Sequence, residues 1–251
     1  MLLAEFVRYL NEMLLIEQFA DYCPNGLQVE GRGQLKKILG AVTASQAAID
    51  RAIHVGADVL LVHHGFFWRS EDPVIKGAKR ARLRSLLSND VSLLAYHLPL
   101  DAHPIYGNNA QLGKLLGLKS ERGFGPRGSK DIGVLGTLEV PEAAEAFCRR
   151  VELALGRRPL LLGDPQKLLY RAAWCTGGAQ NYFETAAAEG VDVFLTGEVS
   201  ESSYHIAKES GVCFLGAGHH ATERYGVLSL GVHLVDRFGL EFEFFDEDNP
   251  V

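Results

Sequence analysis

The stretch that decides the fold is IHVGADVLLVHHG, from Ile53 to Gly65. A glycine ends a helical pattern, and DVLLV (58–62) follows as a short apolar run of the kind that forms a buried strand. Similar runs stand on either side, ILGAV at 38–42 and VSLLAY at 91–96, with helical patterns between them. This alternation predicts an α/β fold with mainly parallel sheets flanked by helices.

The second half of the chain repeats this pattern. AAEGVDVFLTGEV (187–199) aligns with 53–65 and matches Gly190 with Gly56, and the order of strands and helices recurs as well. We therefore expect an internal duplication that gives two similar α/β halves. Glycines cluster near 118–130, so the predicted domains are 1–122 and 123–251, with C-terminal elements able to pack with the first half.

Composition excludes several classes of protein. The 251 residues are 47% hydrophobic and 22% charged, which is typical of a globular protein, and the net charge of −6 argues against a general nucleic-acid coat. Four widely spaced cysteines form no CxxC pair. The charged N-terminal segment has the spacing of an amphipathic helix, and no apolar run approaches the roughly 18 residues of a membrane span. We expect a soluble, cytoplasmic protein.

Five of the nine histidines follow predicted strands. His63 and His64 end the run DVLLV, His97 follows VSLLAY, and His219 and His220 follow VCFLGAG. In open α/β sheets, ligands and chemistry gather beyond the carboxyl ends of the strands. The position of these histidines therefore indicates a functional site.

Two of these histidines precede an acid by four residues, His97 before Asp101 and His219 before Glu223. The same spacing occurs elsewhere in the chain, away from strand ends. The prediction of a site therefore rests on the strand-end position of these histidines, and the four-residue spacing adds little to it. Imidazole and carboxylate donors suit zinc, iron, manganese, cobalt or nickel. Five or six donors fit a two-metal cluster with a bridging carboxylate, because such clusters keep open positions for water.

Gly177 and Gly178 lie between a predicted strand and a helix, where backbone N–H groups can bind an anion. A tight strand-to-helix turn is the alternative, and we favour it.

Four motifs give a specific resemblance: NGLQVEG (25–31), LLVHHGFFW (60–68), HLPLD (97–101) and GAGHHATER (216–224), with TGEVSESSYH (196–205) as a further match. With them the chain resembles, nearly end to end, the dinuclear metal-centre family of GTP cyclohydrolase 1 type 2 homologues. It resembles the short form, which has no large middle insertion.

The resemblance implies a ligand set for two divalent metal ions: His63, His64, Asp101, His219 and Glu223, with Glu223 as the bridge. The resemblance also implies that His97 lies beside the metal ligands or faces the substrate. His220 would lie next to the site without binding a metal. The resemblance further implies a homohexameric toroid whose metal sites face an inner cavity.

The first hypothesis for function is a metal-dependent hydrolase of a small anionic, nucleotide-like substrate. An activated water would attack, and His97 or Glu223 would move protons. Arg224 would orient a phosphate, with a salt bridge as the alternative. Phe66 and Trp68 would wall the pocket or stack on a base, with core packing as the alternative. The name of the family that the chain resembles implies that the reaction would be a ring opening of GTP.

The second hypothesis is a metal-containing ring that acts as a binding or scaffold protein without catalysis. A basic cluster would then meet a polyanion such as nucleic acid, and a solvated helix face is the simpler interpretation of the same residues. The cluster comprises Lys76, Lys79, Arg80, Arg82 and Arg84.

Overall fold

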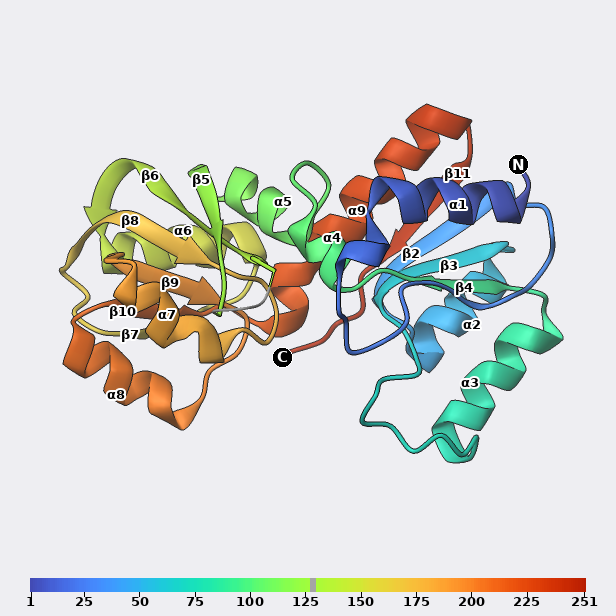
Figure 1. Ribbon diagram of the computed structural model, residues 1–251, viewed down its shortest axis with the longest axis horizontal. Helices are drawn as coiled ribbons and strands as arrows, with labels where there is room; N and C mark the ends of the chain where they lie inside the picture. Colours follow the sequence, from blue (N-terminus) through green and yellow to red (C-terminus); the bar gives the residue numbers. More distant parts are fainter. Residues whose placement is uncertain (127–129) are drawn as a thin grey trace. The chain divides into compact units, whose positions relative to one another are not determined.

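The computed structural model describes residues 1–126 and 130–251 and divides into two compact units (Figure 1). The first unit is Met1–Gly107 with Gly226–Asp248, and the second is Asn108–Tyr225 with Asn249–Val251. This division differs from the predicted one at 122/123, because that position lies inside strand β5, which pairs with β6 in the second sheet.

The first unit holds a five-stranded sheet in the order β1-β4-β3-β2-β11. Only β1 is antiparallel to its neighbour, so this sheet is mainly parallel, as predicted. The strands are β1 (Gly26–Val29), β2 (Lys37–Thr43), β3 (Val59–His64), β4 (Ser92–Ala95) and β11 (Glu241–Phe245).

Helices cover both faces of the first sheet because its strands alternate two sets of apolar side chains. Leu39 and Leu60 pack with α2 and α3 in one core cluster. Ile38 and Leu61, one residue along in each strand, pack with α1 and the later turns of α9 in another (Figure 1). The helices are α1 (Leu3–Met13), η1 (Ile16–Gln18), α2 (Gln46–His54), α3 (Gly77–Ser88) and α4 (Leu98–Ala102).

The second unit holds a six-stranded sheet in the order β5-β6-β8-β9-β10-β7. Only the pairs β8–β9 and β9–β10 are parallel, so this sheet is mixed where the sequence predicted mainly parallel pairing. The difference arises because β5 and β6 form a hairpin and β7 adds an antiparallel edge. The strands are β5 (Leu118–Phe124), β6 (Gly133–Ala143), β7 (Leu160–Leu162), β8 (Leu168–Trp174), β9 (Val193–Thr196) and β10 (Cys213–Gly216).

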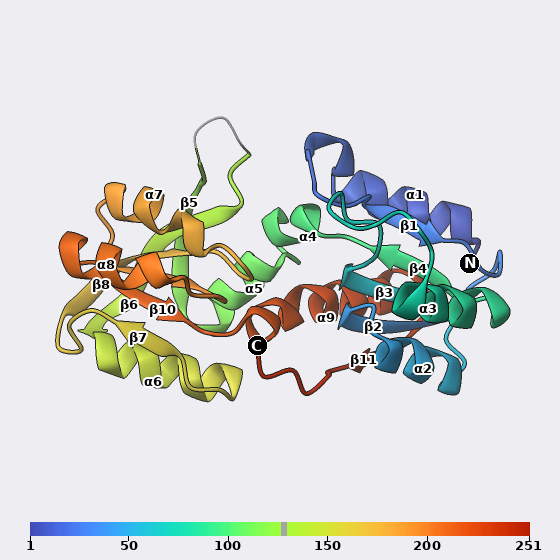
Figure 2. The ribbon, with the colours of Figure 1, turned by 90° about the horizontal axis from the view of Figure 1, so that it is seen from below.

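One core cluster of the second unit joins α5 and α6 to the sheet through Leu112, Phe147 and Trp174. On α7, Phe183 stacks on Phe194 of β9, with the ring centroids 5.8 Å apart. The helices are α5 (Asn108–Leu115), α6 (Ala144–Leu155), η2 (Gln180–Tyr182), α7 (Phe183–Ala188) and α8 (Glu201–Ser210). Helix α9 (His219–Phe238) begins in the second unit and ends in the first (Figure 2).

The same order of elements occurs in both units: β2-α2-β3-α3-β4 in the first and β8-α7-β9-α8-β10 in the second. In each, the three strands are parallel neighbours. This repetition agrees with the expected duplication, and it places His63, His97 and His219 at or just beyond the carboxyl ends of parallel strands. No helix in the described ranges is long and apolar enough to cross a membrane. A cytoplasmic location stays a prediction.

Candidate metal centre

His63 and His64 end β3, which lies between β2 and β4. His63 is fully buried, and its Nδ1 lies 2.9 Å from the carbonyl oxygen of Tyr96. Because a carbonyl only accepts, Nδ1 carries the proton, and in the neutral ring Nε2 carries a lone pair. That Nε2 lies 3.5 Å from Oδ1 of Asp101. Two basic atoms at this separation suit a shared cation.

The glycine of the HHG motif is required by close packing. A Cβ at Gly65 would overlap the side chain of Gln28 and lie 2.6 Å from the Cβ of Ala95. Gln28 in turn accepts a hydrogen bond from the amide of Phe66 at 2.7 Å. The NGLQVEG motif therefore supports the turn that carries the two histidines.

Asp21 and Asn25 hold the imidazole and the backbone at His97. Nδ1 of His97 donates to Oδ1 of Asp21 at 2.7 Å, and the His97 amide donates to Oδ1 of Asn25 at 2.7 Å. The other carboxylate oxygen of Asp21 accepts from the Leu98 amide and from Nδ2 of Asn25. Burial alone would raise the pKa of Asp21, but the hydrogen bond and charge of His97 outweigh it and lower that pKa. The ring of His97 therefore has a fixed orientation.

Within the first unit, ligand atoms of His63, His64 and His97 lie within 4.8 Å of one another. Three imidazoles this close can hold one metal ion, so the donor set fits a divalent metal. A second group, Asp21, Cys23 and His97, meets the same distance criterion. Because both oxygens of Asp21 already accept hydrogen bonds, we interpret this second group as a hydrogen-bonded support.

In the second unit, His219 and Glu223 lie one turn apart at the start of α9. Nε2 of His219 lies 3.2 Å from Oε2 of Glu223, and its Nδ1 lies 2.6 Å from Oε1 of Glu198. Burial alone would lower the pKa of His219, but the carboxylates of Glu223 and Glu198 outweigh it and raise that pKa to about 9. An imidazole between two carboxylates is a site built for positive charge.

The Gly177 turn packs directly beneath Glu223. Gly177 has φ +68°, and a Cβ there would overlap the Glu223 carboxylate. Its amide donates to Oγ1 of Thr222 at 3.0 Å, and its carbonyl accepts from the amides of Gly197 and Glu198. Because the amide and carbonyl of Gly177 already form hydrogen bonds within the protein, the structure supports the interpretation of Gly177–Gly178 as a tight turn over that of an anion site. The same contact explains Thr222 of the GAGHHATER motif, whose hydroxyl oxygen accepts from the Gly177 amide and so holds the turn against α9.

Comparison with known proteins identifies the family. A family model described as Duf34/NIF3 (NGG1p interacting factor 3) matches residues 1–250. The chain belongs to the Duf34/NIF3 family. The "GTP cyclohydrolase 1 type 2 homolog" of Pseudomonas aeruginosa is 53% identical over 250 residues, which cover 100% of this chain and 97% of that protein. The Escherichia coli K12 protein of the same name is 47% identical over 248 residues, covering 98% of both.

Solved structures of similar proteins share the fold. Protein ybgI is 47% identical, with a TM-score of 0.96 over 100% of both chains. TTHA1606 from Thermus thermophilus is 34% identical, with a TM-score of 0.90 over 100% of both chains. The family resemblance expected from the motifs and the α/β fold are therefore confirmed for this Duf34/NIF3 protein.

The other residues predicted for the site differ in their surroundings. Trp68 lies beside the histidine cluster, with its ring centroid 5.0 Å from that of His97. Phe66 is 4% exposed and packs in the core, which fits the structural alternative. Arg224 donates to the carbonyl of Leu155 at the end of α6. Roles in substrate binding for these three residues stay predictions.

The basic cluster of α3 is partly neutralised. Nζ of Lys76 lies 2.7 Å from Asp72, and Nζ of Lys79 lies 3.1 Å from Glu71. These pairs favour a solvated helix face over a polyanion site, so the scaffold hypothesis gains no support here.

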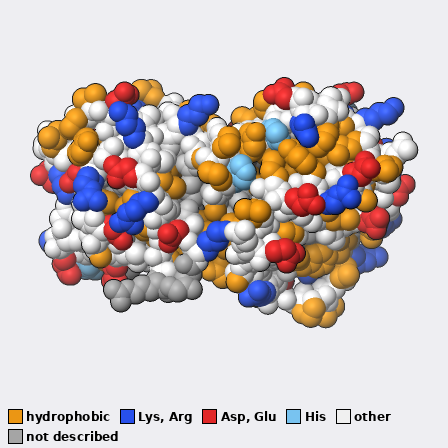
Figure 3. All heavy atoms as spheres, turned by 45° about the horizontal axis from the view of Figure 1, so that its top comes forward, with side chains coloured by type: hydrophobic (Ala, Val, Ile, Leu, Met, Phe, Trp, Pro, Cys, Tyr) orange, Lys and Arg blue, Asp and Glu red, His pale blue; other side chains and the backbone are white. Residues whose placement is uncertain are grey.

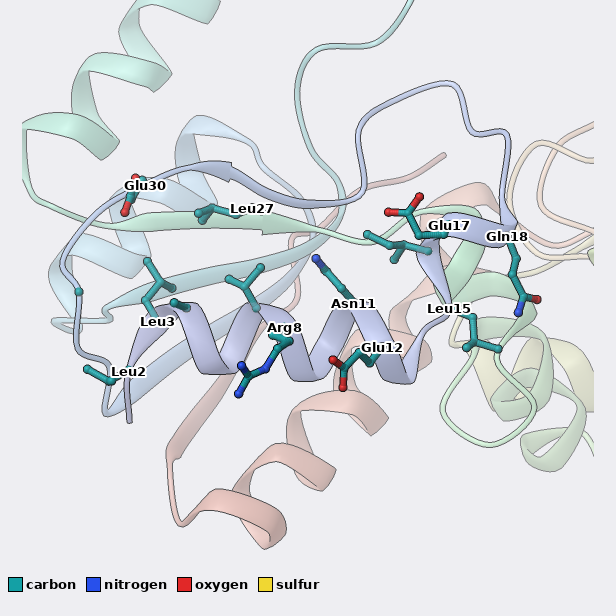
Figure 4. Close-up of a pocket in the computed structure, with 14 residues that line it drawn as sticks. Leu2, Leu3, Arg8, Asn11, Glu12, Leu15, Glu17, Gln18, Leu27 and Glu30 are labelled. Carbon is teal, nitrogen blue, oxygen red and sulfur yellow. The ribbon is translucent and has the colours of Figure 1, made fainter.

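A groove of about 790 Å³ lies along α1 and β1 (Figure 4). Figure 3 shows hydrophobic side chains gathered on the surface of the first unit. Leu2 and Leu15 line the groove and are exposed. Its walls are mostly aliphatic, whereas the donors for a metal are at the strand ends.

Sequence reasoning missed Asp21 and Glu198, two carboxylates that accept hydrogen bonds from Nδ1 of His97 and His219. Asp21 lies in an irregular segment 76 positions before its partner His97, and nothing local marks it. Glu198 had a signal: the alignment that pairs Gly56 with Gly190 also pairs His64 with Glu198. The duplication therefore places a potential metal-site residue at this strand end in both halves.

Proposed function

We propose that this Duf34/NIF3 protein is a divalent-metal protein that hydrolyses a small anionic, nucleotide-like substrate. The observation that carries the proposal lies in the first unit, where Nε2 of His63 is 3.5 Å from Oδ1 of Asp101 at the end of a parallel strand, with His64 and His97 beside it. The ions would be held by His63, His64 and Asp101 from the first unit and by His219 and Glu223 from the second. That these two sets together hold two ions is what the family resemblance implies.

Bound divalent ions would supply Lewis acidity, which lowers the pKa of water and stabilises charge on an anionic substrate. The chain's own contribution to proton transfer is His97. Since Asp21 accepts the Nδ1–H of His97, Nε2 is the nitrogen available to take a proton from an attacking water and return it to a leaving group. The Trp68 ring packs edge-on against this imidazole and limits its rotation.

Elemental analysis tests the metal proposal. We expect about two ions per wild-type chain and a loss of both in Asp101→Ala and Glu223→Ala, because a shared centre fails when either set of ligands is broken. Lys76→Ala is the control, since its side chain is 71% exposed and pairs with the exposed Asp72. Metal-free wild-type protein that takes up no zinc, manganese, iron, cobalt or nickel would contradict the proposal.

Turnover tests the catalytic part separately. GTP and a panel of phosphoesters are incubated with metal-loaded wild-type protein and with His97→Ala. We expect hydrolysis of at least one substrate by the wild type and a rate lower by 10²–10⁴-fold in the variant, which is the usual contribution of a general base. Equal rates in both would exclude His97 as the proton acceptor.

We also propose the homohexamer that the family resemblance implies. Light scattering of the purified protein is expected to give a mass close to six chains of 27.5 kDa. A monomeric mass at working concentration would contradict this part of the proposal and leave the metal site untouched.

A further inference from the structure

Glu198 follows β9 and holds the far side of the His219 ring. Its Oε1 accepts from Nδ1 of His219 at 2.6 Å, and its Oε2 accepts from Nε2 of Gln180 at 3.1 Å. On the other side of the ring, Nε2 of His219 faces Oε2 of Glu223 at 3.2 Å. Four side chains thus form a continuous chain that ends at the proposed metal ligands.

We propose that Glu198 is a positioning residue that fixes the tautomer and the orientation of His219 for metal binding. The inference rests on the proposed function, because it concerns how one of the proposed ligands is presented. Glu198 does not itself bind the ion in this proposal.

The two nitrogens of the His219 ring face different partners. A neutral imidazole carries one proton, and a carboxylate at Nδ1 keeps that proton there. The lone pair is then at Nε2, on the side of Glu223. Without Glu198, the proton can move to Nε2 and the ring can turn, and both changes remove a ligand atom. Carboxylates that hold metal-binding histidines in this way raise the basicity of the ligand as well.

Glu198 is itself well supported. Its amide donates to the carbonyl of Gly177 at 3.2 Å, so its backbone belongs to the same turn that packs beneath Glu223. Gln180 fixes the second carboxylate oxygen. The contact with Gly177 fixes the backbone of Glu198, and the contact with Gln180 fixes its carboxylate. A carboxylate that orients an imidazole has to be held in this way.

A purely stabilising role is a weaker explanation. The side chains of His219 and Glu198 are 28% and 37% exposed. Ion pairs that water reaches contribute little to stability, so Glu198 adds little to folding. Its position in the repeat, opposite His64, also assigns it to the strand end where the first unit presents a candidate metal ligand.

The test measures metal affinity and ligand geometry. Zinc affinity is obtained by competition with a chromophoric chelator, and the visible spectrum of the cobalt-substituted protein reports the coordination geometry. We expect Glu198→Ala to weaken zinc binding by about 10–100-fold and to alter the cobalt spectrum. Glu198→Gln is expected to lie between this variant and the wild type, because its amide oxygen still accepts from Nδ1 without the charge.

The matched control is Glu201→Ala. Glu201 also pairs with an imidazole, since its carboxylate lies 3.1 Å from Nε2 of His205, but on the exposed surface of α8. We expect its zinc affinity and cobalt spectrum to equal those of the wild type. A role of Glu198 limited to folding would lower the thermal stability of Glu198→Ala and leave its cobalt spectrum unchanged.

The outcomes separate this inference from the proposed function. If wild-type protein binds no metal, the proposed function fails and the inference fails with it. If the wild type binds zinc and Glu198→Ala binds it equally well, only the role of Glu198 is overturned. Should Glu198→Ala not fold, Glu198→Gln decides: a wild-type affinity and spectrum in that variant would overturn the inference.

Discussion

Replacing Gly177 with alanine should remove metal binding while the protein stays folded. The new Cβ would overlap the Glu223 carboxylate, and φ of +68° is itself unfavourable for alanine. The backbone strain costs about 1–2 kcal/mol, which a protein of this size tolerates, but the collision displaces a proposed ligand. We expect bound metal to fall to less than about a tenth of the wild-type value, a loss comparable with damage to a ligand's support.

Gly211→Ala separates the strain from the collision. Gly211 lies in the same unit with nearly the same conformation, φ +70°, and a Cβ there meets nothing within 4 Å. Gly177→Ala should therefore lose at least as much thermal stability as Gly211→Ala, while only Gly177→Ala should lose metal. Elemental analysis of each variant measures its metal content, and a thermal melt measures its stability. Full metal content in Gly177→Ala would show that Glu223 is not a required ligand.

The motif residues were predictable because local chemistry marks them. A run such as DVLLV can only be a buried strand or part of a buried helix, and the glycine before it favours the strand. Residues directly after such strands share one edge of a parallel sheet, so the strand-end positions of His63 and His97 followed from the pattern. The amphipathic start of the chain was equally clear, and the structure confirms a helix there with Leu3, Phe6 and Leu10 buried.

Asp21, strand β7 and the unit boundary were not predictable, because each depends on local irregularity or on a partner that is distant in sequence. Asp21 lies in an irregular stretch with no periodicity, and only the folded chain brings it to His97. The antiparallel edge β7 is three residues long, too short to leave a pattern. The unit boundary at Gly107 rather than near residue 122 depends on the pairing of β5 with β6, a contact that apolar spacing does not encode.

Asp21→Ala should be the most destabilising single substitution at the proposed centre. Asp21 is 5% exposed, and its carboxylate accepts from His97, Leu98, Asn25 and the amide of Tyr22. Alanine leaves these partly buried donors without their acceptor. We expect a loss of about 3–5 kcal/mol, seen as a fall of roughly 6–20 °C in the melting midpoint. Asp72→Ala is the control, because Asp72 forms an exposed ion pair with Lys76 and its removal should leave the stability almost unchanged.

The pH dependence of this loss identifies its origin. The pKa of Asp21 in the folded chain lies below its ordinary value of 3.8, so the ionised carboxylate stabilises the fold above that value and loses this effect as pH falls through the folded-state pKa. The stability difference between wild type and Asp21→Ala should therefore be constant from pH 7 to about pH 5 and narrow in more acidic solution. Denaturant unfolding at a series of pH values measures it. A difference that stays constant down to pH 3 would mean that the carboxylate acts through packing and not through its charge.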